Sequence, residues 1–169
     1  MISLFNRMKL EEAFELLLNR KIIASEFNQA SKVINKLKDA DWRLWFGRFL
    51  LFVRSDAENS RFTDAYICLS EAEKLVNSSD DPAVKEEFLS MLNNESLFLE
   101  FKFYYDATGI SSVALLLARF YYNGWGVKQN LEKAYKTAKV AAEMKERDPL
   151  YIEAREVLNS ILIEMSQEK

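Results

Sequence analysis

The chain has 169 residues, no histidine, one cysteine and a net charge of −3. The lack of histidine excludes imidazole bases, Ser-His and Cys-His nucleophile pairs and histidine-ligated zinc sites. Only 4 glycines and 2 prolines interrupt a sequence that is 49% hydrophobic, so helices are favoured over a many-turned β-sandwich. We therefore expect a soluble all-α protein.

Apolar side chains at helical spacing predict four helices in the first half of the chain, near 3–19, 24–39, 41–53 and 62–77. Asp39 or Asp41 is expected to cap the third of them, which is rich in large aromatic residues. The polar stretch 55–60 predicts a loop before the fourth helix.

Two Asp-Pro pairs mark helix starts in the second half. Asp81-Pro82 places a capping side chain before a proline at the first helical position and predicts a helix from Pro82 towards Ala107, with Asn93-Asn94 as a candidate break. Asp148-Pro149 repeats this pattern and is expected to open the last helix, which reaches residue 166. With the hairpin described next, the chain has about eight predicted helices.

Residues 111–147 predict a helical hairpin. Its first helix carries an apolar stripe, and its second helix begins after Asn130, a good N-cap, and presents mostly alanine. Between them Asn123, Gly124 and Gly126 form a tight turn, because glycine tolerates positive φ. The apolar stripe consists of Val113, Leu116, Leu117, Phe120 and Tyr121.

This hairpin resembles one unit of the Sel-one-like repeat family, solenoid relatives of tetratricopeptide repeats. The resemblance lies in the Tyr-x-Asn-Gly-x-Gly-Val turn at 121–127, the Lys133-Ala134 pair and the Ala141-Ala142 end. It implies a short α-hairpin stack in a single domain, with diverged helices over 1–110, a clear unit over 111–147 and a capping helix over 148–166. It also implies a protein-binding surface and an adaptor or scaffold role.

Negative charge is concentrated in the middle of the sequence. Residues 41–100 hold twelve acidic and six basic side chains, a net charge of −6, which would repel nucleic acid and attract a basic protein surface. Asp56, Glu58, Asp64 and Glu71 are therefore candidate contact residues for a partner. The alternative is an ordinary solvated helix surface.

Aromatic residues provide the other candidate contacts. Tyr104, Tyr105, Tyr122 and Trp125 stand close to one another in sequence, and neighbouring residues on a helix cannot all point inward. Exposed Tyr and Trp are typical anchors of protein interfaces. The alternative is that these rings fill the core.

We predict no catalytic, cofactor-binding or metal-binding residue. Adjacent carboxylates such as Glu11-Glu12 point about 100° apart on a helix and do not converge on a substrate. Cys68, in an apolar stretch, is expected to be a buried structural thiol. The lysine row at 128, 133, 136 and 139 reads as a solvated face, so neither nucleic acid nor membrane is an expected partner.

These observations favour a non-enzymatic module that binds a protein partner in the cytosol, since no targeting segment is apparent and the lone cysteine fits a reducing compartment. A narrower hypothesis is a bacterial immunity protein that neutralises a cognate toxin or effector with a basic surface. The alternatives are a chaperone for a secreted protein and an all-α enzyme with an unrecognised carboxylate site.

Overall fold

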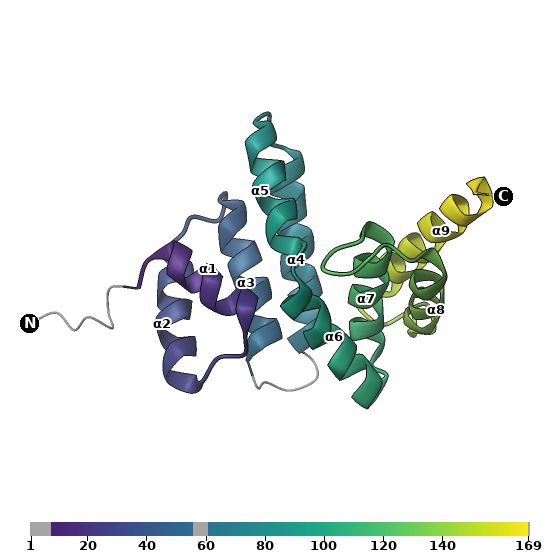
Figure 1. The fold of residues 1–169 in the computed structure, drawn as a ribbon, viewed down its shortest axis with the longest axis horizontal. Coiled ribbons are helices and arrows are strands. Elements are labelled where there is room, and N and C mark those ends of the chain that lie inside the picture. The colour runs from purple at the N-terminus through teal and green to yellow at the C-terminus, as the bar shows by residue number, and fades with distance from the viewer. Residues whose placement is uncertain (1–7, 56–60, 169) are drawn as a thin grey trace, which may run out of the picture. The chain divides into compact units, whose positions relative to one another are not determined.

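The computed structural model describes residues 8–55 and 61–168, and the regular secondary structure of these residues is entirely helical (Figure 1). The prediction of an all-α fold is confirmed. The chain divides into two compact units, Met1–Met91 and Leu92–Lys169. The helices are α1 (Leu10–Asn19), α2 (Ala24–Ile34), α3 (Trp42–Arg54), α4 (Arg61–Asn77), α5 (Pro82–Leu92), α6 (Glu95–Thr108), α7 (Ser111–Asn123), α8 (Leu131–Ala141) and α9 (Tyr151–Gln167).

The described residues form nine helices where about eight were predicted. The segment expected to be one helix from Pro82 is divided at the candidate break, because Asn94 has extended backbone angles and caps a new helix. Its side chain accepts a hydrogen bond of 2.9 Å from the backbone N–H of Leu97. The predicted start of the last helix at Asp148-Pro149 is wrong by two residues. Asp148 instead holds a turn by accepting a 2.9 Å hydrogen bond from the Leu150 N–H.

The first unit is built around α3. In Figure 1, α1 lies across α2 and α3, and α3 packs closely against α4. One side of α3 carries the rings of a buried aromatic cluster whose centroids are 5.5–6.2 Å apart, mostly tilted or edge to face. Such pairs stabilise a core beyond simple burial. The cluster joins α1, α3 and α5 and consists of Phe14, Trp42, Phe46, Phe49 and Phe88.

Gly47 allows α2 to approach α3. A Cβ atom at this position would lie 2.7 Å from Cγ2 of Ile34, a distance that real Cβ contacts do not show. Both residues are buried in the unit. The close helix crossing fixes the relative position of α2 and α3 and therefore the shape of the surface between them.

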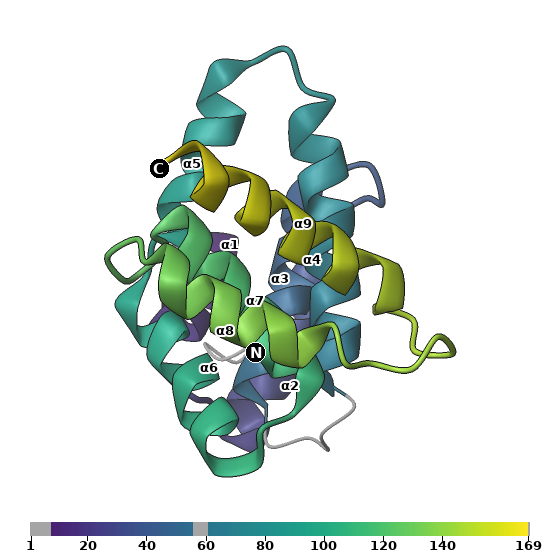
Figure 2. The same cartoon turned by 90° about the vertical axis from the view of Figure 1, so that its right-hand side faces the viewer.

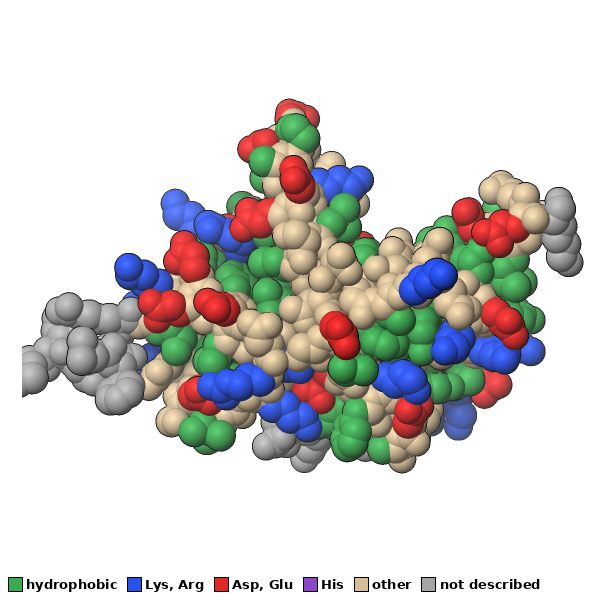
Figure 3. All heavy atoms as spheres, viewed as in Figure 1, with side chains coloured by type: hydrophobic (Ala, Val, Ile, Leu, Met, Phe, Trp, Pro, Cys, Tyr) green, Lys and Arg blue, Asp and Glu red, His purple; other side chains and the backbone are tan. Residues whose placement is uncertain are grey.

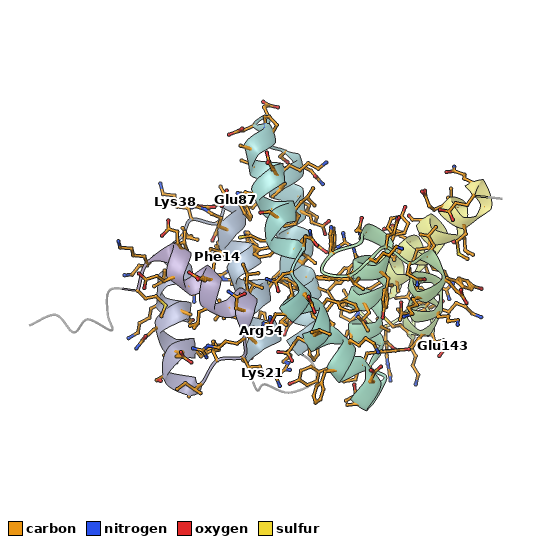
Figure 4. The ribbon with its side chains drawn as sticks, in the orientation of Figure 1. Phe14, Lys21, Lys38, Arg54, Glu87 and Glu143 are labelled. Atoms are coloured by element: carbon orange, nitrogen blue, oxygen red, sulfur yellow. The ribbon has the colours of Figure 1, made fainter. Side chains whose placement is uncertain are left out.

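Arg54 connects the end of α3 to the end of α1 (Figure 4). Its side chain is 3% exposed, and it donates hydrogen bonds of 2.7 Å to the carbonyl oxygens of both Leu17 and Leu18. These carbonyls belong to the last turn of α1, where the helix itself supplies no partner. A buried guanidinium thus supplies the hydrogen bonds that the carbonyl oxygens in the C-terminal turn of α1 would otherwise lack.

The second unit is organised by α7, which contacts α6, α8 and α9. Residues 112–118 are all buried, so this helix is enclosed on every side, as expected for a central helix. The small residues Ala134, Ala138 and Ala141 are the buried face of α8, as predicted, and they permit its close approach to α7. Figure 2 shows α9 lying against these two helices. A repetitive solenoid form and a single 1–169 domain stay predictions.

Candidate functional site

A groove opens between α2 and α3 in the first unit. It has a volume of about 290 Å³, and its surface is mainly apolar. Leu51 and the rings of Phe27 and Phe52 supply the apolar part, and polar groups stand among them. The described residues that line the groove are Phe27, Ser31, Asn35, Arg48, Leu51, Phe52 and Ser55.

Arg48 is the charged residue of this lining, and neutral groups hold it in place. Its Nε donates a hydrogen bond of 3.0 Å to Oδ1 of Asn35, and its guanidinium lies 5.0 Å from the ring centroid of Trp45. Asn35 is itself positioned by a 3.0 Å hydrogen bond from its Nδ2 to the Ser31 hydroxyl. The Trp45 indole is anchored because its Nε1 donates to the Asp39 carbonyl at 2.9 Å. The arginine is therefore preorganised at the groove.

One face of α4 carries a cysteine and two carboxylates. Burial raises the pKa of the Cys68 thiol to about 11, an effect that the Arg48 charge opposes and the carboxylates of Asp64 and Glu71 reinforce. Asp64, Cys68 and Glu71 lie on one face of α4, because they are spaced four and three residues apart on the helix. Cys68 is 7% exposed, which agrees with the predicted buried thiol.

Cys68 should react slowly with alkylating reagents in the folded protein. At pH 8 a thiol of ordinary pKa is about 25% thiolate, whereas a pKa near 11 leaves about 0.1%. We expect iodoacetamide to modify the native chain at least about 100-fold more slowly than the chain unfolded in guanidinium chloride, as followed by intact mass. Equal rates in the two states would show that the thiol is neither buried nor suppressed.

The acidic contact residues predicted from the sequence occupy different environments. Asp64 is exposed on α4, and Glu71, about two turns further along the same helix, forms an ion pair of 3.1 Å with Lys74. Asp56 and Glu58 lie outside the described residues. Two of the four predicted acidic contacts therefore lie on α4.

The predicted aromatic contacts belong to the second unit. Tyr104, Tyr105 and Tyr122 are half-buried. Trp125 is 8% exposed, and its ring packs edge to face on Phe120 at 5.3 Å. The prediction that Trp125 is an exposed contact residue is therefore wrong, because its ring packs into the core and not towards solvent.

The predicted turn has the expected backbone. Gly124 and Gly126 have φ values of 70° and 68°, in the left-handed region. The Nδ2 of Asn123 donates to the carbonyl of Arg119 at 2.8 Å and so ends α7. The N–H of Gly126 donates to Oδ1 of Asn93 at 2.8 Å, which joins this turn to the start of α6. These hydrogen bonds shape the turn and hold it to the start of α6.

Among the described residues, not all acidic side chains from the middle of the sequence are exposed and unpaired. Asp41 pairs with Arg43 at 2.8 Å, and Glu100 is buried. Most of the exposed acidic side chains that remain lie on α5 or in the turn before it, and Figure 3 shows acidic side chains along this helix. This group consists of Asp80, Asp81, Glu86 and Glu87.

Sequence reasoning missed the groove and one exposed apolar pair. Phe27, Arg48 and Phe52 come from two helices, and no local pattern joins them. Leu99 and Phe103 on α6 are 51% and 63% exposed, and their spacing of four residues on one helix face is a signal that could have identified them.

Within residues 8–55 and 61–168, no group of three Cys, Asp or Glu side chains is arranged to hold a metal ion. Over the same part of the chain, none of the helices combines the length and apolar character needed to cross a bilayer. Comparisons with family models, with curated proteins and with solved structures found no match for this chain.

Proposed function

We propose that this protein is a non-enzymatic binding module and that the α2–α3 groove receives part of a protein partner. The observation that carries the proposal is the combination in one groove of exposed apolar surface and a preorganised arginine. Interface centres are rich in aromatic residues and arginine. A cytosolic location belongs to the same proposal and is supported by the single unpaired cysteine.

Membership in the Sel-one-like repeat family is part of the proposal. It is supported by the α7–α8 hairpin, in which a glycine turn with positive φ joins two closely packed helices. Stacked helical repeats commonly present surfaces for protein binding. The proposal does not require the hairpin itself to contact the partner, because its glycines and alanines have structural roles.

The narrower proposal is an immunity protein that blocks a toxin with a basic surface. Its support is the exposed carboxylates on α4 and at the start of α5, which would attract such a surface and speed association. The chaperone alternative uses the same groove to hold an extended segment of a client, so the number of partners distinguishes the two.

Affinity purification with quantitative mass spectrometry tests the proposal. We expect one stoichiometric partner to be recovered with the wild type and to be strongly reduced with Phe52→Ser. The matched control is Phe103→Ser, which removes a ring that is 63% exposed on α6 and should leave recovery unchanged. Several unfolded or secreted clients would favour the chaperone. Loss of the partner with Phe103→Ser but not with Phe52→Ser would overturn the assignment of the groove.

A further inference from the structure

We infer that the groove recognises a segment of the protein partner in which a large apolar side chain lies within a few residues of an Asp or Glu, with Arg48 binding that carboxylate. This inference rests on the proposed function and specifies the chemistry of the partner. It follows from the size of the groove, the bonding of its arginine and the charges around it.

The groove has room for one anchoring side chain. Its volume of about 290 Å³ is just below the ~300–1,000 Å³ typical of pockets for whole small molecules. Phe27, Leu51 and Phe52 present apolar surface to any occupant. A single Leu, Met or aromatic side chain of a partner would bury its apolar surface there and displace water from the groove.

The bonding of Arg48 differs from that of Arg43 and Arg20, the arginines of this unit that pair with carboxylates. Arg43 pairs with Asp41 at 2.8 Å, and Arg20 pairs with Glu26 at 2.5 Å. Among the residues that the structure describes, no carboxylate lies within ion-pair distance of Arg48, which is held by Asn35 and Trp45 instead. A guanidinium fixed through its Nε keeps its two amino groups for a planar carboxylate, which it binds in a two-point arrangement.

Neighbouring charges select against polyanions. Two carboxylates, those of Asp64 and Glu71, lie on α4, the helix that packs against α3, which carries Arg48. They would repel a nucleic acid or an anionic membrane, which bring many negative charges close together. An isolated carboxylate can bind the arginine without that repulsion, and a basic residue nearby in the partner would be favoured. This charge pattern fits a protein segment better than the other anionic surfaces.

A library of random dodecapeptides, selected against the full chain, tests the inference. The selected peptides should be enriched in a large apolar residue with Asp or Glu at a fixed short spacing. Arg48→Gln should weaken their binding about tenfold or more, as expected for loss of a charge-assisted contact. The matched control is Arg43→Gln, on the same helix but already paired with Asp41, which should change affinity less than about twofold.

Changing the acidic residue of a selected peptide to its amide should weaken binding by a similar factor, and this change should have little further effect in the Arg48→Gln chain. Thermal unfolding of the variant should match the wild type, so that misfolding does not account for the loss. Selected peptides that lose affinity with Phe52→Ser but show no acidic preference would overturn this inference and leave the proposed function standing. If no peptide is selected, the groove does not anchor a partner segment and the inference is wrong. If the chain binds decanoate selectively and no peptide, the groove holds a small carboxylic acid and the inference is also wrong.

Discussion

Gly126→Ala should destabilise the protein by about 2–5 kcal/mol, one of the largest effects of any single substitution. The residue has a φ of 68°, which costs alanine about 1–2 kcal/mol. A Cβ atom would also lie 2.2 Å from the carbonyl oxygen of Asn94, so the turn and the start of α6 would have to separate. Overpacking of this kind typically costs a further ~1–3 kcal/mol. Urea denaturation followed by far-UV circular dichroism measures the change.

Gly109 supplies a matched control for this experiment. Its φ of 64° is nearly the same, but a Cβ atom there would meet nothing within 4 Å. Gly109→Ala should therefore show only the backbone cost of about 1–2 kcal/mol. If the two alanine variants are equally stable, the contact between the glycine turn and the Asn93-Asn94 break is not part of the folded state.

Arg54→Met should lower the free energy of unfolding by about 2–4 kcal/mol. The substitution keeps an apolar stem of similar length but leaves the carbonyls of Leu17 and Leu18 without the donor that they have in the native unit. Hydrogen bonds from a charged group contribute about 1.5–3 kcal/mol, and an unsatisfied buried acceptor costs about 1–3 kcal/mol. Arg54→Lys should lie between the variant and the wild type, because an ammonium group lacks the fork that reaches both oxygens.

Hydrogen exchange locates the effect of Arg54→Met, since the amides of α1 should lose protection first. Arg43→Met is the control on the same helix, because its partly exposed pair with Asp41 should contribute no more than about 1 kcal/mol. Equal losses from the two substitutions would show that the end of α1 does not depend on the buried guanidinium.

The helical hairpin was predictable because all its signals are local. The apolar period of 113–121, the glycines at positive φ and the Asn130 cap act within a few residues of one another, and the capping side chain accepts from the Lys133 N–H at 2.9 Å as expected. The Asp81-Pro82 start of α5 was predictable for the same reason. The predicted helix start at Asp148-Pro149 is wrong because the Asp148 side chain accepts a hydrogen bond within a turn and does not cap the helix. The local sequence allows both uses of this side chain and does not decide between them.

The groove was not predictable, because it depends on tertiary packing. Gly47 alone gives no sign that Ile34 fills the space beside it, yet that contact sets α2 against α3. Tertiary packing also explains the wrong prediction for Trp125. Its ring was expected to be exposed because it lies in a turn, but it packs on Phe120 and is buried. A linear count of acidic residues does not reveal that Asp41 is paired and that Glu100 is buried.

Hydrogen–deuterium exchange of the wild-type chain with and without its purified partner tests the central claim most directly. If the groove is the binding site, partner-dependent protection should be strongest in the residues of α2 and α3 that line it, around Phe27 and from Arg48 to Ser55, and weak in α9. Protection confined to α6 or α9, with the groove segments unchanged, would contradict the account.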